Sequence, residues 1–295
     1  MAPESTGSSN GFEAACCLNP ERAGREGYLG LHFKRRGPYT VLSRCRFALP
    51  LQALTPLSMA DGTAYLMMLN PTGGVLGGDR LIAEIVQDEG THVCLSTPSA
   101  TRIYRTVQEK AHQETSIRLG AGAILEYFPD HIIPHTGSAL SQSLRVQMGD
   151  GSKAILFEAA ACGRLAHGER WQFRELESAT EVSLGQRPLY VSRSRIVPSL
   201  IDPRRLGAME DFNYTASLGV FADGPYDWKS IEKNLAAQIA AVDGIFGGTS
   251  LLPRNGCLVR FLTETAVQLS ATTLALWAAA RESLLQLPPF ELRKY

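Results

Sequence analysis

The sequence has no excess of charge of either sign. Its 295 residues carry 29 Lys and Arg and 29 Asp and Glu, so the formal net charge is zero. Nucleic-acid binding depends on a surplus of basic side chains that contact phosphate, so we do not expect nucleic acid as the main partner. A chain without net charge also has little electrostatic self-repulsion, which favours association with other proteins.

Long apolar runs are missing as well. Residues 1–11 contain neither a basic segment nor an apolar one, so we expect no secretory signal. The longest uncharged stretch near the C-terminus, residues 266–280, is interrupted by Gln268 and hydroxyl side chains. It falls short of the roughly 20 apolar residues that a membrane helix needs. The sequence therefore predicts a soluble cytoplasmic protein that has no membrane partner.

Cysteines are few and scattered. The chain has six, and no two of them form a C-x-x-C pair. Disulfide frameworks are typical of small secreted chains, so we expect reduced thiols. The vicinal Cys16 and Cys17 could bind a soft metal, but they more simply belong to a flexible leader. We predict such a leader over residues 1–27 and a single β-rich domain over 28–295.

Short strands separated by turns dominate the chain from Tyr39 to Val197. Glycine-containing turns break the pattern at 70–74, 88–90, 120–122 and 149–151. The expected strands are Thr40–Leu49, Thr63–Leu69, Arg80–Gln87, His92–Ser96, Thr115–Leu119, Ala123–Phe128, Leu144–Met148, Lys153–Ala159 and Leu189–Ile196. No fixed repeat length is visible, so the sequence alone does not indicate a solenoid.

Two helices are predicted after these strands. The first covers about 227–243, with an apolar stripe at helical spacing, Asp227 as N-cap and Gly244 as C-cap. The second covers about 263–286 and is stopped by Pro288 and Pro289. Many strands followed by late helices indicate a mainly β fold, not a β-α-β fold.

Common catalytic and nucleotide-binding motifs are absent. The loop Gly73–Gly78 has the outer spacing of a phosphate loop, but Asp79 and Arg80 follow where Lys and Ser or Thr are required. We therefore expect a multi-glycine turn, or a turn that aims Asp79 at a ligand. There is also no H-E-x-x-H motif.

Two histidines four residues apart do not make a metal site either. Pro129 and Pro134 disfavour a helix that would bring His131 and His135 together, and an extended chain separates them by roughly 13 Å. We expect a proline-bounded loop there.

The more informative feature is a carboxylate set into each of two apolar strands. Alternation places Glu126 on the face of Ile124 and Phe128, and Glu158 on the face of Leu156 and Ala160. A buried carboxylate without a partner is costly, so each should meet a basic side chain, ordered water or a passing cation. The basic partners available are Arg102, Arg105, Arg164 and Arg170.

The segment Thr97–Arg105 is a third feature. If it is extended, Arg102 and Tyr104 share one face while Ile103 and Arg105 share the other. Arg and Tyr are enriched at the centres of protein interfaces, so the segment is either an interface anchor or a polar strand edge.

Four segments in series resemble a known family. They are GGVLGGD at 73–79, TPSATRIYR at 97–105, LEYFP at 125–129 and GRLAHGE at 163–169. Together they resemble the urease accessory protein family UreD, also called UreH, over nearly the whole chain after the leader.

The resemblance implies a fold and a role. It implies a mainly β protein with two helices in the C-terminal half and strands in a helical, layered arrangement. It implies no enzyme activity and no tightly bound metal or cofactor, but a scaffold that passes Ni²⁺ to urease apoprotein together with the partners UreF and the GTPase UreG. The implied metal-transit positions are Asp79, Glu126, Glu158 and Glu169. The implied interface or structural positions are Thr101, Arg102, Tyr104, Arg105 and Arg164.

Two alternatives stay open at this point. The chain could be a pure docking module, with metal passing elsewhere and the carboxylates serving only stability. It could also be a β-rich hydrolase that uses Glu126 and Glu158 as an acid and base, which requires the two carboxyl groups to lie about 5–9 Å apart.

Overall fold

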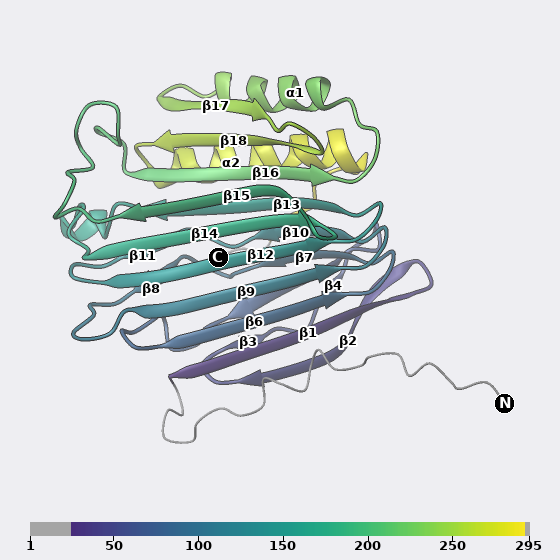
Figure 1. Ribbon diagram of the computed structural model, residues 1–295, viewed down its shortest axis with the longest axis horizontal. Helices are drawn as coiled ribbons and strands as arrows, with labels where there is room; N and C mark the ends of the chain where they lie inside the picture. Colours follow the sequence, from purple (N-terminus) through teal and green to yellow (C-terminus); the bar gives the residue numbers. More distant parts are fainter. Residues whose placement is uncertain (1–24, 293–295) are drawn as a thin grey trace.

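In a computed structural model of the chain, residues 25–292 are described, and they form two stacked β-sheets with two helices packed beside the second sheet (Figure 1). The seven-stranded sheet has the order β15 (Arg187–Ile196), β14 (Glu175–Leu184), β12 (Ala139–Met148), β9 (Ala111–Leu119), β6 (Arg80–Gln87), β1 (Glu26–Arg36) and β2 (Tyr39–Ala48).

The second sheet has eleven strands. Its main order is β17 (Ile245–Leu251), β18 (Gly256–Thr263), β16 (Tyr214–Ala222), β13 (Lys153–Ala161), β10 (Ile124–Phe128), β7 (His92–Ser96), β5 (Ala64–Leu69) and β3 (Gln52–Ala53). Three short strands attach beside this path: β4 (Leu57–Ser58), β8 (Thr101–Ile103) and β11 (Ile132–Pro134).

The chain winds between the sheets as a solenoid. It passes from β6 to β7, from β9 to β10 and from β12 to β13, and it enters the opposite sheet each time. Within each sheet these successive strands are parallel neighbours. Ile124 pairs with His92 of the coil before it and with Lys153 of the coil after it. The separation along the sequence is not the same for these two pairs, so successive coils differ in length. That inequality explains why no fixed repeat is visible in the sequence.

The predicted turns stack on one another at one end of the solenoid. The Gly120 N–H donates to the carbonyl of Gln87 over 2.8 Å, and the Gly122 N–H donates to the carbonyl of Asp150, also over 2.8 Å. Gly122 has a φ of 62°, a left-handed conformation that glycine adopts without strain. The turn signals in the sequence therefore mark the corners of the solenoid.

Apolar side chains fill two layers. One core lies between the two sheets, and the other lies between the eleven-stranded sheet and the C-terminal helices. Strand β7 is buried along its whole length because both of its faces are covered. This arrangement confirms the mainly β, layered fold with two late helices.

Both predicted helices are confirmed, with shorter bounds. Helix α1 covers Trp228–Ala240, and the Asp227 side chain accepts a hydrogen bond from the Ser230 N–H over 3.1 Å, as an N-cap does. Helix α2 covers Ala266–Ala280 and begins later than predicted because β18 extends to Thr263 and Thr265 forms a capping box with Gln268.

A π-helical turn, Arg281–Leu285, extends α2. Gln286 then ends the turn in a left-handed conformation with a φ of 57°. The only other helical segment in the part of the chain that the structure describes is a short 3₁₀ turn, Leu165–His167.

Two boundaries differ from the sequence predictions. Strand β1 begins at Glu26, so regular structure starts within the predicted leader; Cys16, Cys17 and residues up to 24 lie outside the described residues. The segment between His131 and His135 was predicted as a loop, but it contains the short strand β11, which pairs with β8 and β13. Pro134 is tolerated because it ends the strand.

Candidate functional site

A cavity of about 150 Å³ opens between the two sheets. Its outer rim includes the exposed Gly73 and Ser99, and its inner wall includes Tyr127, Leu144 and Glu158. The rim therefore comes from the first two motif segments, and the interior comes from the strands of the solenoid.

Polar side chains occur on the inner wall where apolar ones are usual. Strand β12 places Gln142 in the same inward row as Leu140 and Leu144, and its register sets Gln142 beside Gln113 of β9 and Ser178 of β14. The Gln142 side-chain amide donates to the Ser178 hydroxyl over 3.0 Å. Amides and hydroxyls on stacked coils thus line the cavity, and they can hydrogen-bond water or a hydrated cation.

Glu158 is the acidic group of this wall. It comes from β13, and its Oε2 accepts a hydrogen bond from the Thr180 hydroxyl of β14 over 2.6 Å. The side chain lies deep among protein atoms yet keeps accessible surface, because it faces the cavity. Burial raises its pKa above the ordinary value for Glu, and the Thr180 hydrogen bond opposes that shift.

Asp130 lines the cavity beside its mouth. Its Oδ1 accepts hydrogen bonds from its neighbour His131, from both the backbone N–H and the ring nitrogen Nδ1, each over 2.8 Å. Its backbone N–H donates to the Thr97 hydroxyl over 2.8 Å. A partly exposed carboxylate is therefore held in a fixed orientation near the entrance, with Glu158 further inside.

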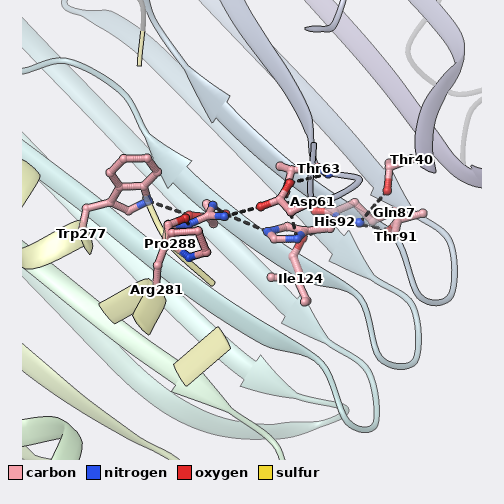
Figure 2. Close-up of polar contacts among 11 residues, drawn as sticks. Thr40, Asp61, Thr63, Gln87, Thr91, His92, Ile124, Trp277, Arg281 and Pro288 are labelled. Atoms are coloured by element: carbon pink, nitrogen blue, oxygen red, sulfur yellow. Dashed lines mark hydrogen bonds and ion pairs between the residues drawn. The ribbon is translucent and has the colours of Figure 1, made fainter. Parts of the chain in front are cut away.

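Glu126 lies on the opposite face of the same sheet, outside the cavity. Its carboxylate accepts hydrogen bonds from His92 Nε2 over 2.7 Å and from Trp277 Nε1 over 2.6 Å, and it pairs with Arg281 Nη1. Arg281 also pairs with Asp61 (Figure 2). Both Glu126 and Arg281 have no exposed side-chain surface. Glu126 is thus sealed in an ion-pair network beneath the C-terminal helices.

The other two acidic candidates also stabilise local structure. Asp79 is 4% exposed, and its carboxylate accepts the Leu76 N–H over 2.8 Å, which closes the glycine turn. Burial raises the pKa of Asp79. Glu169 pairs with both Arg164 Nε and Nη2 and accepts the Thr136 N–H, and the Arg164 guanidinium lowers the Glu169 pKa to about 2.

The predicted interface positions divide between cavity and surface. Thr101 lines the cavity, whereas Arg102 and Arg105 are exposed. Tyr104 packs edge-on against His135, with ring centroids 4.9 Å apart, and its hydroxyl lies 3.4 Å from the Gly73 carbonyl. The first two motif segments therefore contact each other at the cavity rim.

Among residues 25–292, no group of three or more His, Cys, Asp or Glu side chains is arranged to hold a metal ion. The cavity accordingly offers a few separated oxygen donors, not a closed ligand cage. No helix in that same range is both long and apolar enough to cross a membrane.

Comparison with known proteins gives the family. The family model described as UreD urease accessory protein matches residues 25–294. The chain belongs to the UreD family. A urease accessory protein UreD from Herpetosiphon aurantiacus is 31% identical over 274 residues, which cover 91% of this chain and 96% of that protein. UreD from Deinococcus radiodurans is 36% identical over 204 residues, which cover 69% and 73% of the two chains.

UreD proteins are accessory proteins, not enzymes. The positions of Glu126 and Glu158 also argue against the hydrolase alternative, in which these two residues act as acid and base. Glu126 contacts the C-terminal helices, whereas Glu158 contacts β14 across the interior. The two carboxylates lie on opposite faces of one sheet, so they cannot act as an acid and base on a single glycosidic bond.

Several residues around the acidic groups of this UreD protein were not predicted from the sequence. The basic partner of Glu126 is Arg281, which is far away in the chain, and not one of the arginines considered. Gln113 and Gln142 were also overlooked. For Gln142 a signal existed, because an amide interrupts the apolar alternation of Leu140, Leu144 and Val146 along one strand.

Proposed function

We propose that this UreD protein is a scaffold and nickel conduit in urease maturation. In this proposal it works in the cytoplasm between the accessory proteins UreF and UreG and urease apoprotein, and Ni²⁺ is its cargo. The cavity between the sheets, with Glu158 inside and Asp130 near the mouth, is the observation that supports transit. The family membership supports the role in urease maturation.

The donor chemistry of the cavity suits passage better than storage. Imidazole and thiolate ligands bind late first-row metals tightly, and a cage of them would keep nickel. A conduit must bind its ion well enough to admit it and weakly enough to release it. Separated carboxylate, amide and hydroxyl oxygens, as at Glu158, Gln142 and Thr115, offer a hydrated divalent cation this weak, stepwise binding.

Glu158→Gln is the direct test. We expect a several-fold lower nickel content of urease when the variant replaces the wild type in cells that co-express urease, UreF and UreG. The neutral amide keeps the size and an acceptor for the Thr180 hydroxyl but loses the charge that attracts the cation. Nickel per urease is measured by elemental analysis of purified urease, and complex formation by pull-down.

The matched control is Glu181→Gln. Glu181 follows Thr180 on β14 and does not line the cavity; its side chain is 40% exposed and pairs with Arg193 over 2.8 Å on the outer face. We expect normal nickel loading for this variant. Unchanged urease nickel with Glu158→Gln, in a folded and complex-forming protein, contradicts the conduit.

A pure docking module is the second candidate, and a specific observation favours it. Three of the four acidic candidates, Asp79, Glu126 and Glu169, make structural hydrogen bonds or ion pairs outside the cavity. In this alternative the C-terminal helices form the partner surface. Val267 is 78% exposed and Leu274 is 45% exposed on α2, and two such apolar side chains suit a protein contact.

The combined change Val267→Lys and Leu274→Lys tests this docking surface. We expect loss of UreF in a pull-down, because each lysine would have to be desolvated in the complex. Val107→Lys is the control, since Val107 is 85% exposed in the turn before β9. Retained UreF binding by the α2 variant would show that UreF docks on a surface other than Val267 and Leu274.

A further inference from the structure

Strand β17 is an unprotected sheet edge. Within the described residues it pairs with β18 and with no other strand (Figure 1). Its sequence, IFGGTSL, contains neither a charged residue nor a proline. An edge of this kind presents a row of free backbone N–H and C=O groups that can pair with another strand.

The other sheet edges carry the usual protection. Strand β15 has Arg193, Arg195 and Pro188, and β2 has Arg44 and Arg46. Strand β3 is only two residues long. Charge, proline and short length all discourage edge pairing, so the contrast makes β17 the exception among them.

The face of β17 away from α1 is largely exposed, apart from a contact of the Phe246 ring with that of Phe212 at 6.2 Å between centroids. The Thr249 hydroxyl bonds to Glu232 of α1, so Thr249 faces the helix. Alternation then puts Phe246, Gly248 and Ser250 on the opposite face. Phe246 is 69% exposed, and a side chain added at Gly248 would meet no atom within 4 Å.

Helix α1 flanks the same edge. Lys229 and Ala236 are one turn to either side of Glu232, and so lie on the side of the helix that faces β17. Asn234, which bonds to Ser283 over 2.8 Å, marks the other side. The exposed Lys229 lies near the start of α1, and the exposed Asp243 follows its end. Lys229 stands beside the exposed N-cap Asp227, so this flank carries a basic side chain at its start and carboxylates at both ends.

We propose that β17 pairs with β17 of a second copy of this chain, antiparallel about a two-fold axis at Gly248. In that register Phe246 lies opposite Ser250 of the second copy and diagonal to its Gly248, where an aromatic ring covers the glycine. The same axis brings Lys229 of one copy toward Asp243 of the other. This pairing is isologous, which means that both copies use the same uncharged edge and bond each other's free backbone groups. The zero net charge of the chain adds no electrostatic repulsion between the two copies.

Gly248→Lys tests the proposal on the full chain. We expect the wild type to show a concentration-dependent monomer–dimer equilibrium by sedimentation velocity and light scattering. Two lysines facing each other at the axis should weaken self-association by at least about tenfold. The open space at Gly248 lets the monomer keep its fold, which circular dichroism checks. Val107→Lys adds the same charge away from the edge and should leave the equilibrium unchanged.

Mixing Gly248→Lys with Gly248→Glu makes the test specific. Each variant alone should be monomeric, whereas the mixture should form a mixed dimer, because opposite charges then meet at the axis. A wild type that is monomeric at all concentrations overturns the proposal. So does a dimer that survives Gly248→Lys. Loss of UreF binding by Gly248→Lys, with a monomeric wild type, would assign the edge to another protein and also overturn it.

Discussion

Replacing Arg281 with methionine is expected to lower the free energy of unfolding by about 3–5 kcal/mol. Arg281 and Glu126 are both fully buried, and the substitution leaves the Glu126 carboxylate without its cation in a water-excluded layer. The hydrogen bonds from His92 and Trp277 remain, but the guanidinium charge beside the carboxylate is lost. Urea unfolding followed by tryptophan fluorescence and circular dichroism measures the change.

The double variant Glu126→Gln with Arg281→Met identifies the cause. The amide introduced by Glu126→Gln is a neutral acceptor for His92 and Trp277, so we expect the double variant to recover most of the stability lost by Arg281→Met. Arg204→Met is the control: it removes the surface pair with Asp202 and should leave the unfolding midpoint unchanged. A double variant as unstable as Arg281→Met would show that the arginine acts through its packing against Trp277 and Phe290.

This network shows what the sequence could and could not reveal. The position of Glu126 within an apolar strand predicted that it needs a partner, and it has one. The partner itself was not predictable, because it depends on where α2 and its π-helical turn lie against β7 and β10. Local pattern identifies a buried charge, whereas the three-dimensional fold decides which distant residue compensates it.

The strands that the sequence predicts are likewise those with a clear local pattern, and a strand that depends on its neighbours was missed. Arg80–Gln87 and His92–Ser96 match β6 and β7 at both ends, because glycine turns or a proline bound them and their apolar residues are continuous or alternate. Strand β17 was missed because its two glycines and small polar residues have low strand propensity. It forms because β18 supplies its hydrogen bonds and α1 covers one face.

The acidic residues of the cavity also could not be identified from local pattern alone. Of the four acidic positions that the family resemblance implied, only Glu158 lines the cavity. All four are acidic side chains in motifs or apolar strands, and one-dimensional pattern does not distinguish a strand face that meets the opposite sheet from one that meets a helix. The inward direction of Glu158 becomes visible only through its contact with Thr180.

Gly163→Ala is expected to lower the free energy of unfolding by about 2–4 kcal/mol. Gly163 has a φ of 147°, which side-chain-bearing residues rarely adopt. A Cβ there would overlap the backbone carbonyl oxygen of Glu169, which cannot move without breaking the turn. That turn carries the Arg164–Glu169 ion pair and the Glu169 bond to the Thr136 N–H. Urea unfolding and limited proteolysis within 163–170 measure the effect.

Gly168→Ala separates steric overlap from backbone strain in the same motif. Gly168 has a φ of 70°, but an added Cβ would meet nothing within 4 Å, so we expect a loss of only about 1 kcal/mol. Equal losses for the two variants would mean that left-handed strain alone governs both positions. A larger loss at Gly163 would mean that GRLAHGE needs glycine there for close backbone approach. The motif would then hold its shape through close backbone packing, which positions the bonds of Glu169 to Arg164 and Thr136.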